Sequence, residues 1–385
     1  MPNTSAGKIR IGIIGPSWWV DYWHLPALQR HSRAEICAIC GQTERSREQL
    51  GERYGERARW FTDWEEMLTV AAPDGVIVCT PNDLHYPATM AALRRNAHVV
   101  CEKPLALNAR QAREMANEAK SRRLIGMTNF PYRDNPAIQM FRTLSIDGFA
   151  GKPLHLTAHY YGGFGLHRPP GWRGSRARSG SGILGDLGSH LIDLVRFVTG
   201  REFVTVCAQS LTLLPHEHGP SPDLAPTNGP LVEDRNDDSC AFLAELEGGV
   251  NAVLHTSWIA LQGAAVQSQM IELYGTLGRL RFEATHAGTR LLGMEAEEAR
   301  WRELPVAGIA PSGDTFRGED EDYFRPGRHT AANTTYRWIE AICAGAPAIS
   351  PDLNDGLLAQ EVIDAVEKSS RERRWAPVAN SKPSA

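Results

Sequence analysis

Several features that would define a function class are missing from this sequence. No apolar run approaches the roughly 18 residues that a transmembrane helix needs, so we expect no membrane span. Residues 1–8 contain no apolar signal region, and the prediction is a cytoplasmic protein. A net charge of −4 and a pI near 6.4 give no electrostatic reason to bind nucleic acid or an acidic membrane surface.

Cysteine is also scarce, with seven residues in a chain of 385. An odd, scattered set does not form a disulfide framework and suits reduced thiols. Cys37 and Cys40 lie in a β-branched stretch that predicts a strand, so we interpret them as structural. His216 and His218 flank Glu217 in a proline-rich stretch without a further ligand nearby, so no metal site is predicted. Neither a P-loop nor a G-x-S-x-G motif is present.

The chain length predicts two or three domains. Over residues 1–130, short β-branched runs alternate with helical patterns, which predicts an α/β fold with a doubly wound parallel sheet. The expected strands there are 8–15, 35–40, 75–80 and 98–101. Residues 131–385 hold a run of closely spaced strand patterns, typical of an antiparallel or mixed sheet. Residues 168–185 are rich in Gly, Pro, Ser and Arg and predict a loop, followed by a helix over 186–199.

A nucleotide-binding turn is predicted after the first strand. Only the first glycine of G-x-G-x-x-G is present, as Gly15, and Ser17 stands at the second position. Trp18 and Trp19 follow, either to pack the helix or to form a wall for a ligand. The second strand ends in Gly41-Gln42-Thr43 without the carboxylate that usually binds the adenosine ribose. NAD remains compatible with these side chains, and NADP is not excluded.

The most informative stretch is Val99 to Pro104. An apolar run ends in Glu102-Lys103-Pro104, where a buried parallel strand would end. Ligands of open α/β sheets bind at the carboxyl ends of the strands, so Lys103 is placed to meet a substrate hydroxyl.

A second candidate segment is Gly182 to Asp193. Asp186 and His190 are four residues apart and would share one face of a helix. Histidine suits proton transfer near neutrality, and a nearby ammonium would stabilise an alkoxide. Just upstream, Arg168, Arg173, Arg176 and Arg178 form either a solvated loop or a clamp for an anionic substrate group.

These segments together resemble the glucose-fructose oxidoreductase/inositol dehydrogenase/rhizopine catabolism family, Gfo/Idh/MocA. The resemblance implies an N-terminal Rossmann domain over 1–130 and a C-terminal α/β domain with a large open sheet over 131–385. An alternative assignment places the last helix of the chain in the first domain. The resemblance also implies NAD as cofactor and a homo-oligomer, a dimer or tetramer, formed through that sheet. Lys103 and His190 would handle the proton, and Asp186 would hold the sugar. The implied cofactor contacts are Gly15, Ser17, Trp18, Trp19, Gly41, Gln42, Thr43, Thr80, Pro81, Asn82, His85, Glu102, Lys103, Asn129, Trp172 and Arg173. The implied substrate contacts are Lys103, Tyr132, Arg173, Arg176, Arg178, Asp186 and His190.

Three functions remain open at this point. The first is an NAD(P)-dependent dehydrogenase acting on a secondary hydroxyl of a sugar, polyol or sugar derivative. The second is an NAD-requiring glycoside hydrolase that oxidises the sugar transiently, eliminates the aglycone and reduces the ring again. The third is an inactive nucleotide sensor, against which the intact Lys103 and His190 argue. Net NADH production separates the first two.

Overall fold

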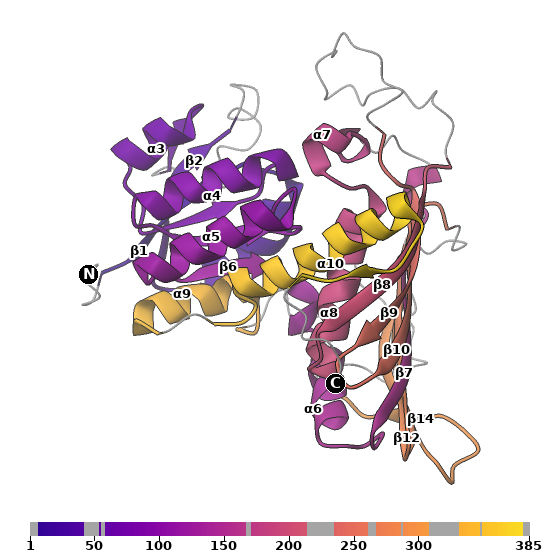
Figure 1. Cartoon of the computed structure of the whole chain (residues 1–385). Helices are drawn as coiled ribbons and strands as arrows, with labels where there is room; N and C mark the ends of the chain where they lie inside the picture. Colours follow the sequence, from indigo (N-terminus) through magenta and orange to yellow (C-terminus); the bar gives the residue numbers. More distant parts are fainter. Residues whose placement is uncertain are drawn as a thin grey trace. The chain divides into compact units, whose positions relative to one another are not determined.

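The computed structural model describes residues 7–41, 54, 58–166, 171–213, 235–260, 267–285, 288–307, 331–346 and 349–379. The chain divides into two compact units (Figure 1). Unit 1 spans Met1–Pro131 and Gly327–Gln360, and unit 2 spans Tyr132–Pro326 and Glu361–Ala385. Some positions discussed from the sequence lie outside the described residues, namely Gln42, Thr43, Arg168 and the segment 216–218.

Unit 1 contains a six-stranded parallel sheet in the order β3-β2-β1-β4-β5-β6. This is the strand order of a Rossmann fold, so the predicted doubly wound sheet is confirmed. The strand order reverses between β1 and β4, and ligands of such sheets bind at that point. The strands are β1 (Ile9–Ile14), β2 (Ala34–Cys40), β3 (Arg59–Phe61), β4 (Gly75–Val78), β5 (His98–Glu102) and β6 (Gly126–Asn129).

Helices cover both faces of this sheet. On one face, apolar side chains of α3, α4, α5 and the start of α10 pack against the strands, and on the other face those of α1 and α9 do so. The helical elements are the π turn η1 (Val20–His24), α1 (Leu25–Arg30), α3 (Trp64–Val70), η3 (Asn82–Leu84), α4 (His85–Arg94), α5 (Ala109–Arg122), α9 (Thr334–Ala344) and α10 (Leu353–Glu372). Side-chain caps set the starts of several: Asn108, for example, accepts the amide of Gln111 at 3.1 Å.

Unit 2 contains one large sheet (Figure 1). It has nine strands, in the order β14-β13-β12-β11-β7-β10-β9-β8-β15. Its pairs are antiparallel except for β7 with β10, so the expected mostly antiparallel sheet is confirmed. The strands are β7 (Pro153–Gly162), β8 (Phe203–Leu211), β9 (Ser239–Leu246), β10 (Val250–Ser257), β11 (Gln267–Gly275), β12 (Gly278–Thr285), β13 (Gly288–Glu295), β14 (Arg302–Leu304) and β15 (Ala376–Pro377).

One face of this sheet is packed against helices α6 (Pro136–Ile146) and α8 (Ser189–Thr199). The opposite face carries half-exposed side chains such as Leu243 and Val253. Residues 168–185, expected to be a loop, contain short helical turns in their described part: η6 (Gly171–Gly174), α7 (Arg176–Ser179) and the start of the π turn η7 (Leu184–Gly188). The remaining short turns are η4 (Pro131–Asp134) and η5 (Phe164–Leu166). Among the described helices, none combines the length and apolar character that crossing a bilayer requires.

Candidate active site

The turn after β1 lies against the end of β4. Gly15 has a φ of 84°, in the left-handed region that favours glycine. A Cβ at this position would lie 2.6 Å from the Cys79 carbonyl oxygen, so the two chain segments are in direct contact. Ser17, which replaces the second motif glycine, places its Oγ 3.3 Å from Cys79 Sγ. The predicted residues Gly15, Ser17 and Thr80 therefore meet at the point where the strand order reverses.

Glu102 is the last residue of β5 and the centre of a buried hydrogen-bond network. Its Oε1 accepts from Trp19 Nε1 at 2.6 Å, from Asn129 Nδ2 at 2.6 Å and from His24 Nε2 at 2.9 Å. Three predicted residues are thus brought together: Trp19 from the segment after β1, Glu102 from the end of β5 and Asn129 from the end of β6. The sequence spacing did not reveal His24, a fully buried residue 78 positions from its partner.

These contacts keep Glu102 ionised. Burial alone would raise the pKa of this carboxyl group, but the contacts with His24, Asn129 and the Lys103 ammonium outweigh it and hold the pKa below its usual range. The next residue, Lys103, is half-buried, and its backbone N–H lies 3.4 Å from Glu102 Oε2. A fixed negative charge therefore stands directly beside the candidate catalytic lysine.

The donor atoms of His24, Cys79 and Glu102 lie within 4.8 Å of one another, a spacing that a metal ion could use. The oxygen of Glu102 that faces His24 already accepts three hydrogen bonds, and Cys79 contacts Ser17. The atoms of His24, Cys79 and Glu102 that could bind a metal ion are therefore already engaged in hydrogen bonds within the protein.

His85 connects the loops that follow β4 and β5. Its Nδ1 lies 2.9 Å from the Pro104 carbonyl oxygen, and its Nε2 lies 2.9 Å from the Thr80 carbonyl oxygen. Burial lowers the pKa of the ring, while the two carbonyl contacts oppose this effect. Both ring nitrogens face the protein's own backbone, so His85 orders the Thr80–Asn82 and Lys103–Pro104 loops. Asn82 is buried beside it, and Pro81 is half-exposed.

Four aromatic rings gather over the turn after β1. Trp19 stacks on Trp23 with a centroid distance of 6.2 Å and an interplanar angle of 9°. Trp18 and Tyr22 pack against Trp19 at 5.4 and 5.5 Å. Trp18 is 68% exposed, so the two predicted tryptophans have different environments: Trp19 is anchored to Glu102 and Trp18 faces outward.

In unit 2, His190 lies in a buried aromatic setting near the start of α8. Its ring is 4.6 Å from that of Tyr132 and 6.2 Å from that of Tyr160. The two tyrosine hydroxyls hydrogen-bond to each other, and Tyr160 donates to Gln267 Oε1 at 3.0 Å. The predicted residues Tyr132 and His190 therefore lie together, and Tyr160 and Gln267 join them from the sheet.

Asp186 does not begin a regular helix as expected but lies in the π turn η7, with α8 starting at Ser189. A π turn accommodates one extra residue, so Asp186 and His190 are not in simple α-helical register. The Asp186 carboxylate lies 3.4 Å from Arg173 Nε, and the Arg173 guanidinium stacks on Trp172 at 4.4 Å. Asp193, three residues after His190, is held by Arg133 Nε at 2.8 Å.

The predicted arginine clamp is divided in the structure. Arg173 is directed to Asp186, while the exposed Arg176 pairs with Glu367 of α10 at 3.0 Å. Arg178 is half-buried in α7. Burial raises the pKa of Glu367 to about 7, with Arg176 opposing the shift and Asp237 adding to it. Arg176 is therefore partly engaged within the protein.

The raised pKa of Glu367 predicts a pH-dependent stability. Between its unfolded value near 4.5 and about 7, the folded state binds more protons, so this group makes unfolding easier as the pH rises through that window. Glu367→Gln is expected to raise the melting temperature at pH 8 by about 2–4 °C and to change it little at pH 4.5. Scanning fluorimetry at both pH values measures this. A variant less stable than the wild type at pH 8 would show that the partly exposed Arg176 pair dominates instead.

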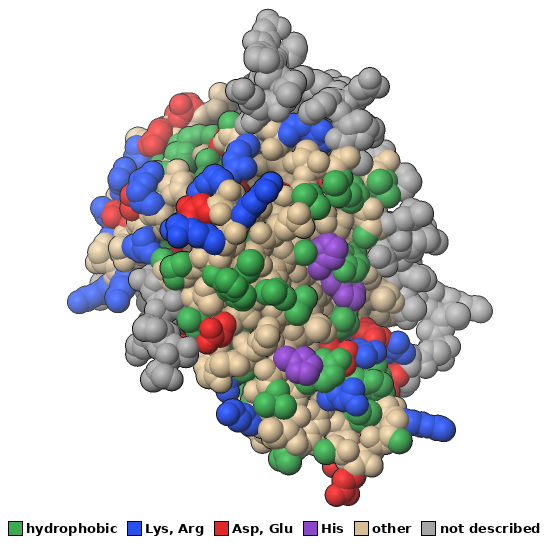
Figure 2. All heavy atoms as spheres, turned by 45° about the vertical axis from the view of Figure 1, so that its right-hand side comes forward, with side chains coloured by type: hydrophobic (Ala, Val, Ile, Leu, Met, Phe, Trp, Pro, Cys, Tyr) green, Lys and Arg blue, Asp and Glu red, His purple; other side chains and the backbone are tan. Residues whose placement is uncertain are grey.

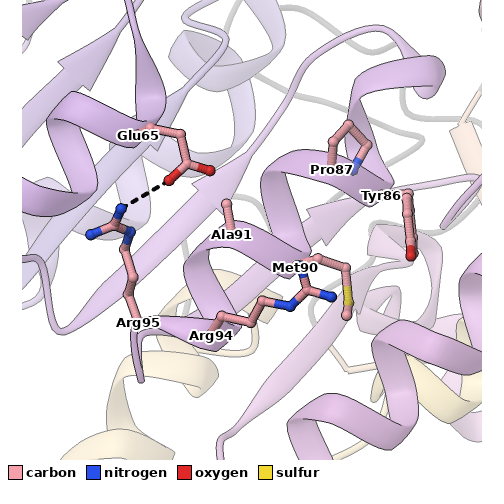
Figure 3. Close-up of a pocket in the computed structure, with 7 residues that line it drawn as sticks. All are labelled: Glu65, Tyr86, Pro87, Met90, Ala91, Arg94 and Arg95. Carbon is pink, nitrogen blue, oxygen red and sulfur yellow. Dashed lines mark hydrogen bonds and ion pairs between the residues drawn. The ribbon is translucent and has the colours of Figure 1, made fainter.

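A separate hollow of about 520 Å³ lies on unit 1, on the outer side of α3 and α4 (Figure 3). Two of its lining residues, Arg95 and Glu65, form an ion pair at 3.0 Å. None of the residues predicted to bind cofactor or substrate lines this hollow. The candidate residues therefore form two groups, each within one unit: the strand ends around Glu102 and Lys103 in unit 1, and the segment of Asp186 and His190 in unit 2.

Comparison with known proteins gives the class of the chain. Residues 9–130 match the oxidoreductase family with an NAD-binding Rossmann fold, and residues 138–281 match the GFO/IDH/MocA C-terminal domain. The chain is an oxidoreductase with an NAD-binding Rossmann domain. It belongs to the Gfo/Idh/MocA family, as the sequence motifs indicated.

The individual relatives share about a quarter to a third of their aligned residues with this chain. Levoglucosan dehydrogenase of Pseudarthrobacter phenanthrenivorans is 24% identical over 98% of this chain and 99% of its own length. D-glucoside 3-dehydrogenase of Escherichia coli is 32% identical over 51% of this chain and 55% of its own. Among solved structures, an oxidoreductase domain protein from Kribbella flavida superposes with a TM-score of 0.81 at 28% identity, covering 97% of this chain and 100% of that one.

Proposed function

We propose that the chain transfers a hydride between a nicotinamide cofactor and a secondary hydroxyl of a sugar, polyol or sugar derivative. The observation that carries this proposal is the buried, ionised Glu102, held by three hydrogen-bond donors directly before Lys103 at the end of β5. Such a network fixes the end of β5 and therefore the backbone of Lys103, which follows it directly. The names of the two relatives, a levoglucosan and a glucoside dehydrogenase, support a carbohydrate substrate.

The residues of unit 1 fit a dinucleotide. A glycine turn leads from β1 into a helical segment where the strand order reverses, and such a helix start favours a pyrophosphate. In this proposal Gly15, Ser17, Trp19 and the Thr80–Asn82 loop hold the cofactor. His85, placed among the cofactor contacts from sequence, acts through the backbone of these loops. When bound, the nicotinamide supplies the hydride acceptor.

The protein's own side chains remove the proton of the substrate hydroxyl. We assign Lys103 to the substrate hydroxyl, where its ammonium stabilises the developing alkoxide. His190 receives the proton, and the rings of Tyr132 and Tyr160 restrict the orientation of the imidazole. Asp186 binds a neighbouring sugar hydroxyl, and its carboxylate lies 3.4 Å from Arg173 Nε. Arg176 and Arg178 complete the proposed substrate contacts, and Trp172 is proposed to contact the cofactor.

The test is a panel of sugars and polyols incubated with NAD or NADP while absorbance at 340 nm is recorded. The proposal expects stoichiometric NADH with at least one substrate. Paired neutral and anionic sugars show whether Arg176 and Arg178 select for charge. Release of an aglycone without net NADH would indicate the redox-neutral glycosidase instead. Absence of both reactions across the panel would leave only the nucleotide sensor.

A homo-oligomer, a dimer or tetramer in the cytoplasm, forms through the open face of the unit 2 sheet in this proposal. Hydrophobic and histidine side chains gather on this face (Figure 2). Leu243 and Val253 are opposite each other on β9 and β10 and are 44% and 45% exposed. Beside them, burial and the nearby His255 lower the pKa of His159 to about 4, so this ring is neutral at pH 7. A second copy of the same face would bury these apolar side chains and the neutral ring of His159.

The combined change Leu243→Asp and Val253→Asp is expected to convert the oligomer to a monomer, because it places like charges at the centre of a self-complementary contact. Light scattering after size-exclusion chromatography gives the mass. The matched control is Leu154→Asp, a 47% exposed leucine of β7 that lies outside this face. An unchanged mass in the double variant would place the interface elsewhere.

A further inference from the structure

The stretch Asn236–Asp238 lies against the start of the segment that carries Asp186 and His190. Asp237 Oδ1 accepts the amide of Gly182 at 2.8 Å, and Asp237 Oδ2 accepts the amide of Leu184 at 3.0 Å. The backbone carbonyl of Asp237 accepts the amide between them, that of Ile183, at 3.0 Å. One residue thus binds three consecutive backbone amides. We propose that Asp237 is a positioning residue for His190 and Asp186, an inference that rests on the proposed function.

The contact between the two segments is close. A Cβ at Gly182 would lie 2.2 Å from the Asp237 carbonyl oxygen and 2.8 Å from Asn236 Cβ. Any side chain at position 182 would therefore push the two backbones apart. Glycine at the start of this segment is required by the approach of Asp237, which ties the motif glycine to a residue 55 positions later.

The geometry at Gly182 is passed along the turn to the site residues. The Asp186 amide donates to the Gly182 carbonyl at 2.9 Å, and the π turn η7 runs on into α8, whose second residue is His190. The first amides of a helical segment have no partner within the segment, and a carboxylate at this end both accepts them and suits the helix dipole. Without the carboxylate, two amides lose their acceptors and the turn loses its fixed starting point.

The neighbouring Asn236 anchors the other half of the site. Its Nδ2 donates to the Arg173 carbonyl at 2.8 Å and to Ser179 Oγ at 2.6 Å, and its amide donates to the Gly174 carbonyl at 3.1 Å. The stretch Asn236–Asp238 therefore holds both the segment Arg173–Ser179 and the segment that begins at Gly182. The segments that carry Arg173 and Asp186, whose side chains lie 3.4 Å apart, therefore share one anchor.

The test compares Asp237→Asn with Asp63→Asn. An asparagine at 237 keeps one acceptor oxygen and turns an NH₂ group toward the second amide. Asp63 is the matched control, because its carboxylate also accepts two backbone amides, those of Glu65 at 2.7 Å and Glu66 at 3.0 Å, at the start of α3 in unit 1. Asp237→Asn is expected to lower kcat 10-fold or more, to move the acid limb of the pH profile, and to leave the Kd for NAD within twofold. Asp63→Asn is expected to keep kcat within twofold.

Hydrogen exchange provides a readout that does not depend on activity. Amides of residues 182–190 are expected to exchange at least 10-fold faster in Asp237→Asn and at the wild-type rate in Asp63→Asn. Unchanged exchange, or a kcat above half the wild-type value with an unchanged pH profile, would overturn the inference. If the wild type reduces no NAD with any sugar, the proposed function fails while the exchange result still decides the role of Asp237. If Asp237→Asn does not fold, Asp237→Ser, which keeps one acceptor oxygen, is measured in the same way and by the same limits.

Discussion

Lys103→Ala is expected to lower kcat by two orders of magnitude or more. In the proposed mechanism the Lys103 ammonium is the group that meets the substrate hydroxyl, and positioned acid–base groups contribute about 10²–10⁴ to a rate. The Glu102 network is made by Trp19, His24 and Asn129, so it remains intact without the lysine side chain. The Kd for NAD, followed by tryptophan fluorescence, is therefore expected to stay within a few-fold of the wild-type value.

The control for this change is Lys120→Ala, which removes an exposed ammonium from α5 of the same unit. Turnover by this variant should equal that of the wild type. A Lys103→Ala variant that retains more than a tenth of the wild-type kcat would remove the lysine from the mechanism. Loss of NAD binding together with kcat would instead make Lys103 a cofactor ligand.

His190→Asn is expected to reduce kcat by a similar factor and to remove an ionisation near neutrality from the pH profile. Activity that depends on a neutral imidazole falls as the pH drops, so the acid limb should disappear from the residual activity of the variant. The measurement is kcat/KM between pH 5 and 9. His155→Asn, which changes an exposed histidine of β7 stacked on Tyr274 at 4.2 Å, is the control and should keep the wild-type profile. An acid limb that persists in His190→Asn would assign the ionisation to another group.

Four of the six strands of the parallel sheet could be predicted from the sequence because they are short apolar runs rich in β-branched residues. Strands β3 and β6 contain no such run and were not predicted. The stretches at 9–14, 75–78 and 98–102 are strands within one or two residues of the expected limits. The helix α6 was not predicted, although Asn135 caps it at 2.9 Å and Pro136 occupies its first turn, a combination that marks a helix start. Strand β13 was also missed, and so were the short helical turns between Gly171 and Gly185, where composition favours a loop.

The site was predictable where a motif lies within one segment and not where contacts join distant segments. Glu102 and Lys103 follow one strand, and Asp186 and His190 lie in one segment, so their residue types and spacing were visible. His24 and Asp237 were not found, because their partners lie 78 and 55 residues away. The contact of Arg176 with Glu367, 191 residues apart, was hidden in the same way and changes the interpretation of the arginine loop.

Two histidines of the candidate site are placed by π turns. His24 ends the turn Val20–His24, and His190 comes two residues after the turn Leu184–Gly188. Each such turn holds one residue more than an α turn would. Removing a single residue from either would restore α-helical winding and rotate the flanking residues by about 100° relative to each other. The number of residues in each turn is therefore as important as their types. A variant with one residue more or fewer there would misdirect the imidazole even if every side chain of the site were retained.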